Sequence, residues 1–169
     1  MKLKKIICWP PLLAGVGAGF TITILTYITF QSILAGHIYG LWLTAAFGSS
    51  VVLVFGYPEN EFAQPKNVIF GHLISAFVGI VFVTLFKISQ DRTIFFLAIG
   101  LAVGFSVMLM MAFKVTHPPA GANTILVIFT QDSFQFLIFP ILVGAVTIII
   151  GGVVYNRFIL KKKYPLKWF

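Results

Sequence analysis

The chain has 169 residues, of which 59% are hydrophobic and only 9% are charged, and its formal net charge is +8. Five long stretches contain no Asp, Glu, Lys or Arg: 6–58, 67–86, 93–113, 115–131 and 133–156. A bilayer core needs about 20 apolar residues for each helical crossing. This composition excludes a soluble domain and predicts an all-α polytopic integral membrane protein.

Hydropathy divides the chain into six apolar segments, separated by short polar turns. They cover about 11–34, 39–55, 68–87, 93–113, 118–130 and 136–160. Four of them are long enough to span the membrane, whereas the second and fifth are short and could be re-entrant segments or half-helices. We expect one membrane domain over 1–169, with a basic C-terminal tail at 161–169.

Basic residues flank the apolar region at both ends. They are Lys2, Lys4 and Lys5 before it, and Arg157, Lys161, Lys162, Lys163 and Lys167 after it. Under the positive-inside rule, this pattern predicts cytoplasmic N and C termini in a bacterial inner (plasma) membrane, and no nucleic-acid partner. The first apolar segment is too long for a cleaved signal peptide, so we expect an uncleaved helix.

The two halves of the sequence resemble each other at an offset of 73 residues. The pairs are Gly48/Gly121, Leu53/Leu126, Val54/Val127, Gly71/Gly144 and Gly79/Gly152. We therefore expect two related three-segment repeats, at about 10–88 and 92–160, an arrangement typical of transporters. If the short segments cross the membrane the repeats are inverted, and if they re-enter the repeats are parallel. The sequence leaves both arrangements open.

Small residues recur four positions apart, as they do where transmembrane helices pack closely. They are Gly15/Gly19, Gly100/Gly104 and Gly71/Ser75/Gly79. These stripes predict helix contacts within the subunit or in a homo-oligomer, and we expect a homo-oligomer embedded in membrane lipid.

Acidic residues are nearly absent from the chain. The four are Glu59, Glu61, Asp91 and Asp132, all in predicted loops. A cation carrier usually needs intramembrane carboxylates, so an anionic or neutral permeant is favoured. The scattered His37, His72 and His117 and the single Cys8 match no ligand spacing. We therefore expect no metal, no cofactor and no enzymatic activity.

The sequence His117-Pro118-Pro119-Ala120-Gly121-Ala122 predicts the start of a helix inside the apolar region. Prolines suit the first turn of a helix, because an N–H would be unpaired there anyway. If this start lies below the membrane surface, its free N–H groups and the positive end of its dipole form an anion-binding arrangement.

Polar side chains follow a glycine in both short segments. Ser49 and Ser50 come after Gly48, and Asn123 and Thr124 after Gly121, in what we expect to be equivalent first turns. Two such helix starts could replace part of the hydration shell of an anion. The alternative is that these side chains cap helices or bind neighbouring carbonyls.

Histidine and lysine side chains could also take part in anion binding. His72 and His117 could donate to an anion or titrate near neutral pH, whereas His37 is expected to be structural. Lys66 and Lys114 could snorkel to the interface or attract anions to a pore mouth.

The motif at 117–122 resembles the signature of the HPP family of integral membrane proteins, and the stretches 46–53 and 63–72 are similar to the family in the same order. The resemblance implies four spanning helices and, because plastid and cyanobacterial members are linked to nitrite transport, a small-anion substrate. The chain departs from the family at Asn123, where Thr is common, and at Phe70, where Gly is common. Phe70 would narrow any passage that it lined.

We therefore predict a transporter or channel for a small inorganic anion, with nitrite as the first candidate. The predicted binding residues are Gly48, Ser49, Ser50, His72, His117, Pro118, Pro119, Gly121, Ala122 and Asn123. A non-transporting membrane sensor or assembly module is the alternative that the sequence leaves open, followed by transport of a neutral solute.

Overall fold

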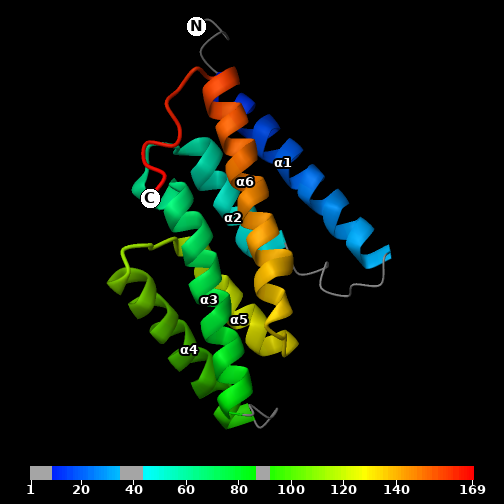
Figure 1. Cartoon of the computed structure of the whole chain (residues 1–169), viewed down its shortest axis with the longest axis vertical. Helices are drawn as coiled ribbons and strands as arrows, with labels where there is room; N and C mark the ends of the chain where they lie inside the picture. Colours follow the sequence, from blue (N-terminus) through cyan, green and yellow to red (C-terminus); the bar gives the residue numbers. More distant parts are fainter. Residues whose placement is uncertain (1–8, 35–43, 87–91) are drawn as a thin grey trace, which may run out of the picture.

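The computed structural model describes residues 9–34, 44–86 and 92–169, and every element in these ranges is a helix or helical turn (Figure 1). Several sequence predictions fall outside the described residues. They are the basic residues Lys2, Lys4 and Lys5, the break around His37, the start of the second segment at 39, and the turn at 89–91.

Four helical segments are long and apolar enough to cross a membrane. They are α1 (Trp9–Leu34), α3 (Pro65–Phe86), α4 (Arg92–Ala112), and a last one composed of η6 (Leu137–Leu142), α6 (Val143–Val153) and η7 (Val154–Ile159). The prediction of four long helices is confirmed.

Two shorter segments lie among the long helices. The first is α2 (Thr44–Val51), which continues as η3 (Val52–Gly56), and the second is η5 (Pro118–Ala120), which continues as α5 (Gly121–Thr130). The paired prolines begin the second short segment, as predicted, because the first helical turn needs no N–H from them. The prediction of two short segments is also confirmed.

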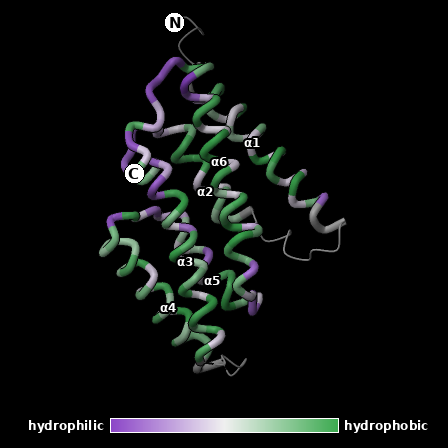
Figure 2. The backbone as a smooth tube through the Cα atoms, in the orientation of Figure 1, coloured by the Kyte–Doolittle hydropathy of each residue, from purple (hydrophilic) through white to green (hydrophobic). Residues whose placement is uncertain are grey.

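The direction of the helices alternates along the chain (Figure 1). α1 and α3 run downward in this view, and the short helix α2 between them runs upward. α4 and α6 run upward, and the short helix α5 between them runs downward. The start of α1 and the end of η7 therefore lie at the same end of the molecule. Figure 2 shows hydrophobic residues along the long helices, and hydrophilic residues gathered in the C-terminal segment and in the loop before α3.

The stripe of small residues on α3 packs the short helix α5 against it. A Cβ added to Gly79 would lie 2.9 Å from the Cβ of Val127, and one added to Gly71 would lie 2.6 Å from the Cβ of His117. This stripe therefore makes contacts within the subunit. By contrast, a Cβ at any of Gly15, Gly19, Gly100 and Gly104 would have no neighbour within 4 Å.

The last long segment differs from the single continuous helix that we predicted. Phe139 has non-helical angles (φ −130°, ψ 113°) immediately before Pro140. Proline lacks a donor N–H and its ring clashes with the preceding turn, so the helix is interrupted there. The regular part, α6, begins at Val143.

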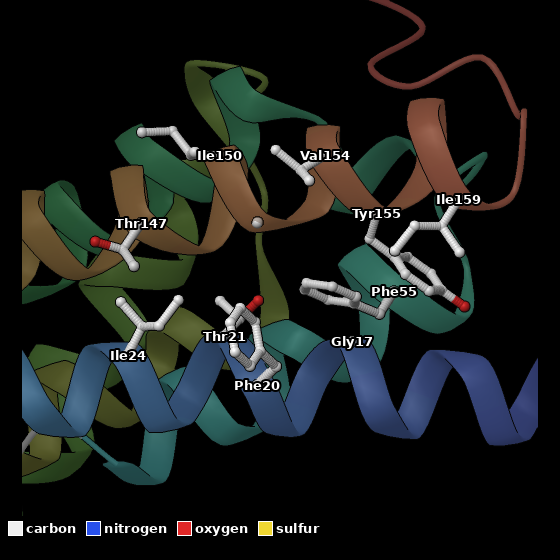
Figure 3. Close-up of a pocket in the computed structure, with 11 residues that line it drawn as sticks. Gly17, Phe20, Thr21, Ile24, Phe55, Thr147, Ile150, Val154, Tyr155 and Ile159 are labelled. Carbon is white, nitrogen blue, oxygen red and sulfur yellow. The ribbon is translucent and has the colours of Figure 1, made fainter.

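A lateral groove of about 310 Å³ separates α1 from α6 (Figure 3). Beside the groove, the two helical segments contact each other at two glycines. Tyr155 fills the space that a side chain at Gly17 would need, and Thr21 fills the space that a side chain at Gly151 would need. The walls of the groove are almost entirely apolar, for example Phe20, so it resembles the lipid-facing surface of the helices around it.

The C-terminal segment folds back over the end of the helices. Tyr164 is fully buried, and its hydroxyl donates to the carbonyl of Ala63 at 2.8 Å. Burial raises the pKa of Tyr164, so the hydroxyl keeps the proton that it donates. The side chain of Gln64 accepts from the N–H of Leu166 at 2.8 Å. The basic tail is thus an ordered cover on the loop between α2 and α3.

Candidate functional site

Four polar side chains from separate elements meet inside the helix bundle. Ser50 lies in the last turn of α2, His72 in α3, His117 immediately before η5, and Asn123 in the first turn of α5. None of the four exceeds 1% exposure. His117 has extended backbone angles, because a residue that precedes proline is kept out of the helical region. The sequence predicted all four as site residues, and the structure brings them together.

The hydroxyl of Ser50 joins the two histidines. Its Oγ lies 2.9 Å from Nε2 of His72 and 2.8 Å from Nε2 of His117. The same oxygen lies 2.9 Å from the carbonyl of Ala46, one turn earlier in α2. The two imidazole rings are 5.0 Å apart, and the ring of Phe47 lies 4.7 Å from that of His72. Ser50 is therefore the centre of a buried polar cluster.

The outer ring nitrogen of each histidine also has a partner. Nδ1 of His117 lies 2.7 Å from the carbonyl oxygen of Phe62, in the loop before α3. Nδ1 of His72 lies 2.8 Å from the side-chain nitrogen of Asn123. We call the hydrogen-bonded series Asn123–His72–Ser50–His117–Phe62 the histidine chain.

A second polar contact lies beside the histidine chain. The hydroxyls of Ser75 and Thr124 are 2.8 Å apart, Thr124 donates to the carbonyl of Ser75, and Ser75 donates to the carbonyl of Ala120. From the sequence, Ser75 belongs to a packing stripe and Thr124 lies next to the predicted site. Their pairing was not predicted, although the stripe of small residues on α3 was a signal for it.

A cavity of about 440 Å³ lies at the end of the molecule where α3 begins and α4 ends. We call it the vestibule. Its lining combines three lysines with two glutamates, two buried amides and the C-terminal segment: Lys66, Lys114, Lys167, Glu59, Glu61, Gln64, Asn67, Leu166 and Phe169. Lys66 and Lys114, which the sequence analysis proposed as anion attractors, thus line one cavity.

Two connections lead from the wall of the vestibule to the histidine chain. The side chain of Asn67 donates to the carbonyl of Thr116, the residue before His117, at 2.9 Å. Phe62, whose carbonyl accepts from the ring of His117, directly follows the lining residue Glu61. The backbone from Lys114 to His117 therefore leads from the vestibule to the buried cluster. Neither connection could be read from the sequence, because Asn67 and Thr116 are 49 residues apart.

The remaining predicted site residues lie outside the histidine chain. Ser49, Pro118 and Ala122 are exposed, while Gly48, Pro119 and Gly121 are partly buried. Phe70 is also exposed, with 41% of its surface accessible. Gly48 and Gly121 share one property, because a Cβ at either position would have no neighbour within 4 Å.

The start of the second short segment offers fewer free donors than we predicted. Pro118 and Pro119 have no N–H, Ala120 donates its N–H to the carbonyl of His117, and Gly121 donates to Pro118. The tight first turn thus uses the donors that an anion would need. In α2, Ser49 and Ser50 lie in the last turn rather than the first, since the helix begins at least as early as Thr44 and continues through Gly48.

The fold and the charge distribution define a polytopic α-helical membrane protein. The chain also matches the family described as HPP, transmembrane region, over residues 5–165, and it therefore belongs to this family of integral membrane proteins.

Two transmembrane proteins of Dictyostelium discoideum are similar to the chain. One is 37% identical over 130 residues, which are 75% of this chain and 45% of the relative. The other is 32% identical over 133 residues, 76% of this chain and 42% of the relative. The chain spans less than half of the length of these curated relatives. No solved structure matches it.

Proposed function

We propose that this protein carries a small inorganic anion, nitrite first among the candidates, across the membrane. The observation that carries the proposal is the vestibule, where Lys66, Lys114 and Lys167 line one cavity at the mouth of a buried polar cluster. Three lysines against two glutamates give the lining a net positive charge, which favours anions over cations in a concave site.

The position of the vestibule supports its role as the mouth of a transport path. It lies next to the buried cluster, whose side chains Ser50, His72, His117 and Asn123 could replace part of the hydration of an anion. An anion that leaves the vestibule past His117 would exchange water for these donors. The chain is a small-anion transporter in this proposal and has no enzymatic role.

The arrangement of the short helices supports a transporter as well. Gly79 packs against Val127, and Gly152 packs against Val54. The two contacts are related by the offset of 73 that relates the halves of the sequence. Helices α1 and α3 run opposite to α4 and α6 (Figure 1). We infer two inverted repeats, at about 10–88 and 92–160, with the transport path where the short helices meet the long ones.

Charge supports an orientation of the molecule. Lys66, Lys114 and Lys167 lie at the vestibule, and Tyr164 joins the C-terminal segment with Lys161, Lys162 and Lys163 to the same end. Under the positive-inside rule, we propose that the vestibule and both termini face the cytoplasm. The bacterial plasma membrane stays a prediction from the sequence.

Open glycine faces support a homo-oligomer. Gly15 and Gly19 on α1, and Gly100 and Gly104 on α4, have no neighbour where a Cβ would stand. Small residues at this spacing allow close helix approach between subunits. In the proposed assembly, copies of the chain meet along these faces and lipid covers the rest.

The test is nitrite uptake into proteoliposomes of the purified protein, with nitrate, chloride, formate and urea as competitors. Protein-free vesicles give the background of nitrous acid that crosses bare lipid. We expect saturable uptake that anions inhibit and urea does not. Combined Lys66→Gln and Lys114→Gln should raise KM, because the vestibule loses two positive charges, while Lys163→Gln, outside the vestibule, should not.

A second variant probes the path itself. Leucine at Gly121 meets no internal atom at its Cβ, so Gly121→Leu should fold and should reduce uptake if anions pass this position. Gly56→Leu, at an exposed position where an added Cβ also meets nothing within 4 Å, is the matched control. If well-folded protein gives no uptake above the lipid background, the transport proposal is wrong, and a partner that copurifies would then favour a sensor or assembly module.

A further inference from the structure

The hydrogen-bond direction along the histidine chain is set by Phe62 and Asn123, the partners at the two ends of the chain. The carbonyl of Phe62 can only accept, so Nδ1 of His117 carries a proton and donates it. The amide nitrogen of Asn123 can only donate, so Nδ1 of His72 is bare and accepts. In neutral imidazole only one nitrogen is protonated. Nε2 of His72 is then a donor, and Nε2 of His117 is an acceptor.

Ser50 fits between these two nitrogens. Its oxygen accepts from Nε2 of His72. Its single proton has two possible acceptors, Nε2 of His117 at 2.8 Å and the carbonyl of Ala46 at 2.9 Å, and in the neutral chain it goes to the bare nitrogen of His117. Every hydrogen bond then points the same way, from Asn123 through His72, Ser50 and His117 to Phe62. Such a series can pass a proton between its members by short transfers, since each separation is at most 2.9 Å.

The same geometry accommodates one extra proton. If Nε2 of His117 is protonated too, His117 donates to Ser50, and the serine hydroxyl turns to donate to the carbonyl of Ala46, 2.9 Å away. Ser50 then accepts from both histidines. An extra proton on His72 would instead face the amide nitrogen of Asn123. The charged form of the chain is therefore centred on His117.

We propose that His117, Ser50 and His72 form a proton relay, and that one proton moves through it with each transported anion. This inference rests on the proposed function and adds the coupling ion to it. Transport is then symport of an anion and a proton.

The charge balance of the bundle interior argues for such coupling. Among the described residues that are buried, none is Asp, Glu, Lys or Arg. An anion inside a low-dielectric interior needs a positive partner, because an unpaired buried charge is strongly disfavoured. The lysines end at the vestibule, so beyond it the histidines are the groups that can supply a positive charge.

One relay step conserves protons. His72 takes a proton at Nδ1 when Asn123 turns aside, and its Nε2 proton passes to Ser50. The hydroxyl proton of Ser50 passes to Nε2 of His117, and His117 releases its Nδ1 proton toward the vestibule. One proton is taken up, one is released and no electrons move. With the vestibule in the cytoplasm, this sequence carries the proton inward. It leaves both histidines in the opposite tautomer, so the rings and the Ser50 hydroxyl must return to their starting orientation before the next proton enters.

Other titratable groups surround this relay, and the pH dependence of transport includes them. His72 on α3 faces His117 directly. The vestibule adds Glu59 and Glu61 from the loop before α3, Lys66 from α3, Lys114 from the end of α4 and Lys167 from the C-terminal segment. The lysines oppose protonation of His117 and the glutamates favour it.

The test compares two driving forces for nitrite uptake into proteoliposomes, after subtraction of uptake by protein-free vesicles. Symport of one anion with one proton is electroneutral, so acid outside should drive uptake, and an inside-positive K⁺ diffusion potential should not. In Ser50→Ala the acid-driven component should fall about 100-fold, a loss of the size seen when a positioned proton-transfer group is removed. Thr23→Ala removes an exposed hydroxyl with the same i−4 carbonyl contact and should leave uptake unchanged.

Each contrary result has a separate meaning. Potential-driven uptake that ignores the pH gradient would overturn the coupling and leave the transport function intact, as would full acid-driven uptake by Ser50→Ala. No uptake at all would overturn both. Nitrogen-15 NMR of histidine-labelled wild-type protein tests the relay without any variant. In the resting protein we expect neutral His72 protonated at Nε2 and neutral His117 at Nδ1. The opposite tautomers as the resting state would contradict the hydrogen-bond direction on which the relay rests.

Discussion

Lys114 occupies a backbone conformation that usually belongs to glycine. Its φ is 55°, in the left-handed region. The N–H of Val115 donates to Met110 and that of Lys114 to Met111, which is the Schellman arrangement that ends many helices. A side chain in this conformation is strained, and such strain often accompanies function. The side chain of Lys114 lines the vestibule. This role explains why lysine stands at a position where glycine would adopt the backbone conformation without strain.

Lys114→Gly should therefore separate stability from transport. Glycine relieves the left-handed strain, so we expect the protein to become more stable by about 1 kcal/mol. The vestibule loses one positive charge, so KM for nitrite should rise. Thermal unfolding in detergent and uptake kinetics measure the two effects. A variant that is more stable and transports nitrite with unchanged KM would remove Lys114 from the anion site.

Adjacent serines show what the sequence could and could not predict at this scale. The sequence predicted both Ser49 and Ser50 as donors, yet Ser50 is buried against two histidines while Ser49 is exposed and contacts the carbonyl of Ala45. Successive residues on a helix point in different directions. Which of the two faces inward depends on how α2 packs, and its pattern of apolar residues is too short to decide this.

Among the helices, α3 has a face where close packing requires glycine. Gly71 lies against His117, and Gly79 lies against Val127, so one face of α3 holds both the histidine chain and the short helix α5. The small-residue spacing predicted a packing face, but it could not name the partner. The predicted lengths of the four long helices were confirmed, because hydropathy follows membrane thickness. The interruption at Phe139 depends on Pro140 and was missed.

Gly71→Ala should destabilise the protein for this reason. The added Cβ would lie 2.6 Å from the Cβ of His117 and 3.2 Å from the carbonyl oxygen of Val115. Overpacking of this kind costs about 1–3 kcal/mol, and here it also displaces a member of the histidine chain. Gly104→Ala, where the added Cβ meets nothing, is the matched control. Equal melting temperatures for the two variants would show that α3 can move away from His117.

At the scale of the whole molecule, the vestibule and the docked C-terminal segment lie at the same end. The C-terminal segment is bound there through Tyr164 and Leu166, and Lys167 and Phe169 form part of the vestibule wall. The sequence predicted this tail only as a basic flank. Its docking joins residues about 100 positions apart, such as Ala63 and Tyr164, and no local pattern encodes a contact of that kind.

The number of times the chain crosses the bilayer can be determined from the side of the membrane on which each turn lies. If α5 crosses the bilayer, Ser133 after it must lie on the side opposite to Lys114, and if α5 re-enters, the two residues share a side. The direction of the helices (Figure 1) favours a crossing, because α4 and α6 run the same way with α5 between them. A short helix can complete such a crossing where neighbouring protein covers its ends.

Single cysteines in a Cys8→Ser background decide between the two arrangements. We expect Lys114→Cys and Lys163→Cys to react with a membrane-impermeant maleimide from one face of oriented vesicles, and Ser133→Cys from the other. Ser133 and Lys163 are exposed, so labelling reports sidedness rather than burial. Labelling of Lys114→Cys and Ser133→Cys from the same face would make α5 re-entrant and the repeats parallel. It would also place Phe62, at the end of the histidine chain, on the same side of the membrane as the end of α5. An anion would then have to leave the protein between α5 and its neighbours.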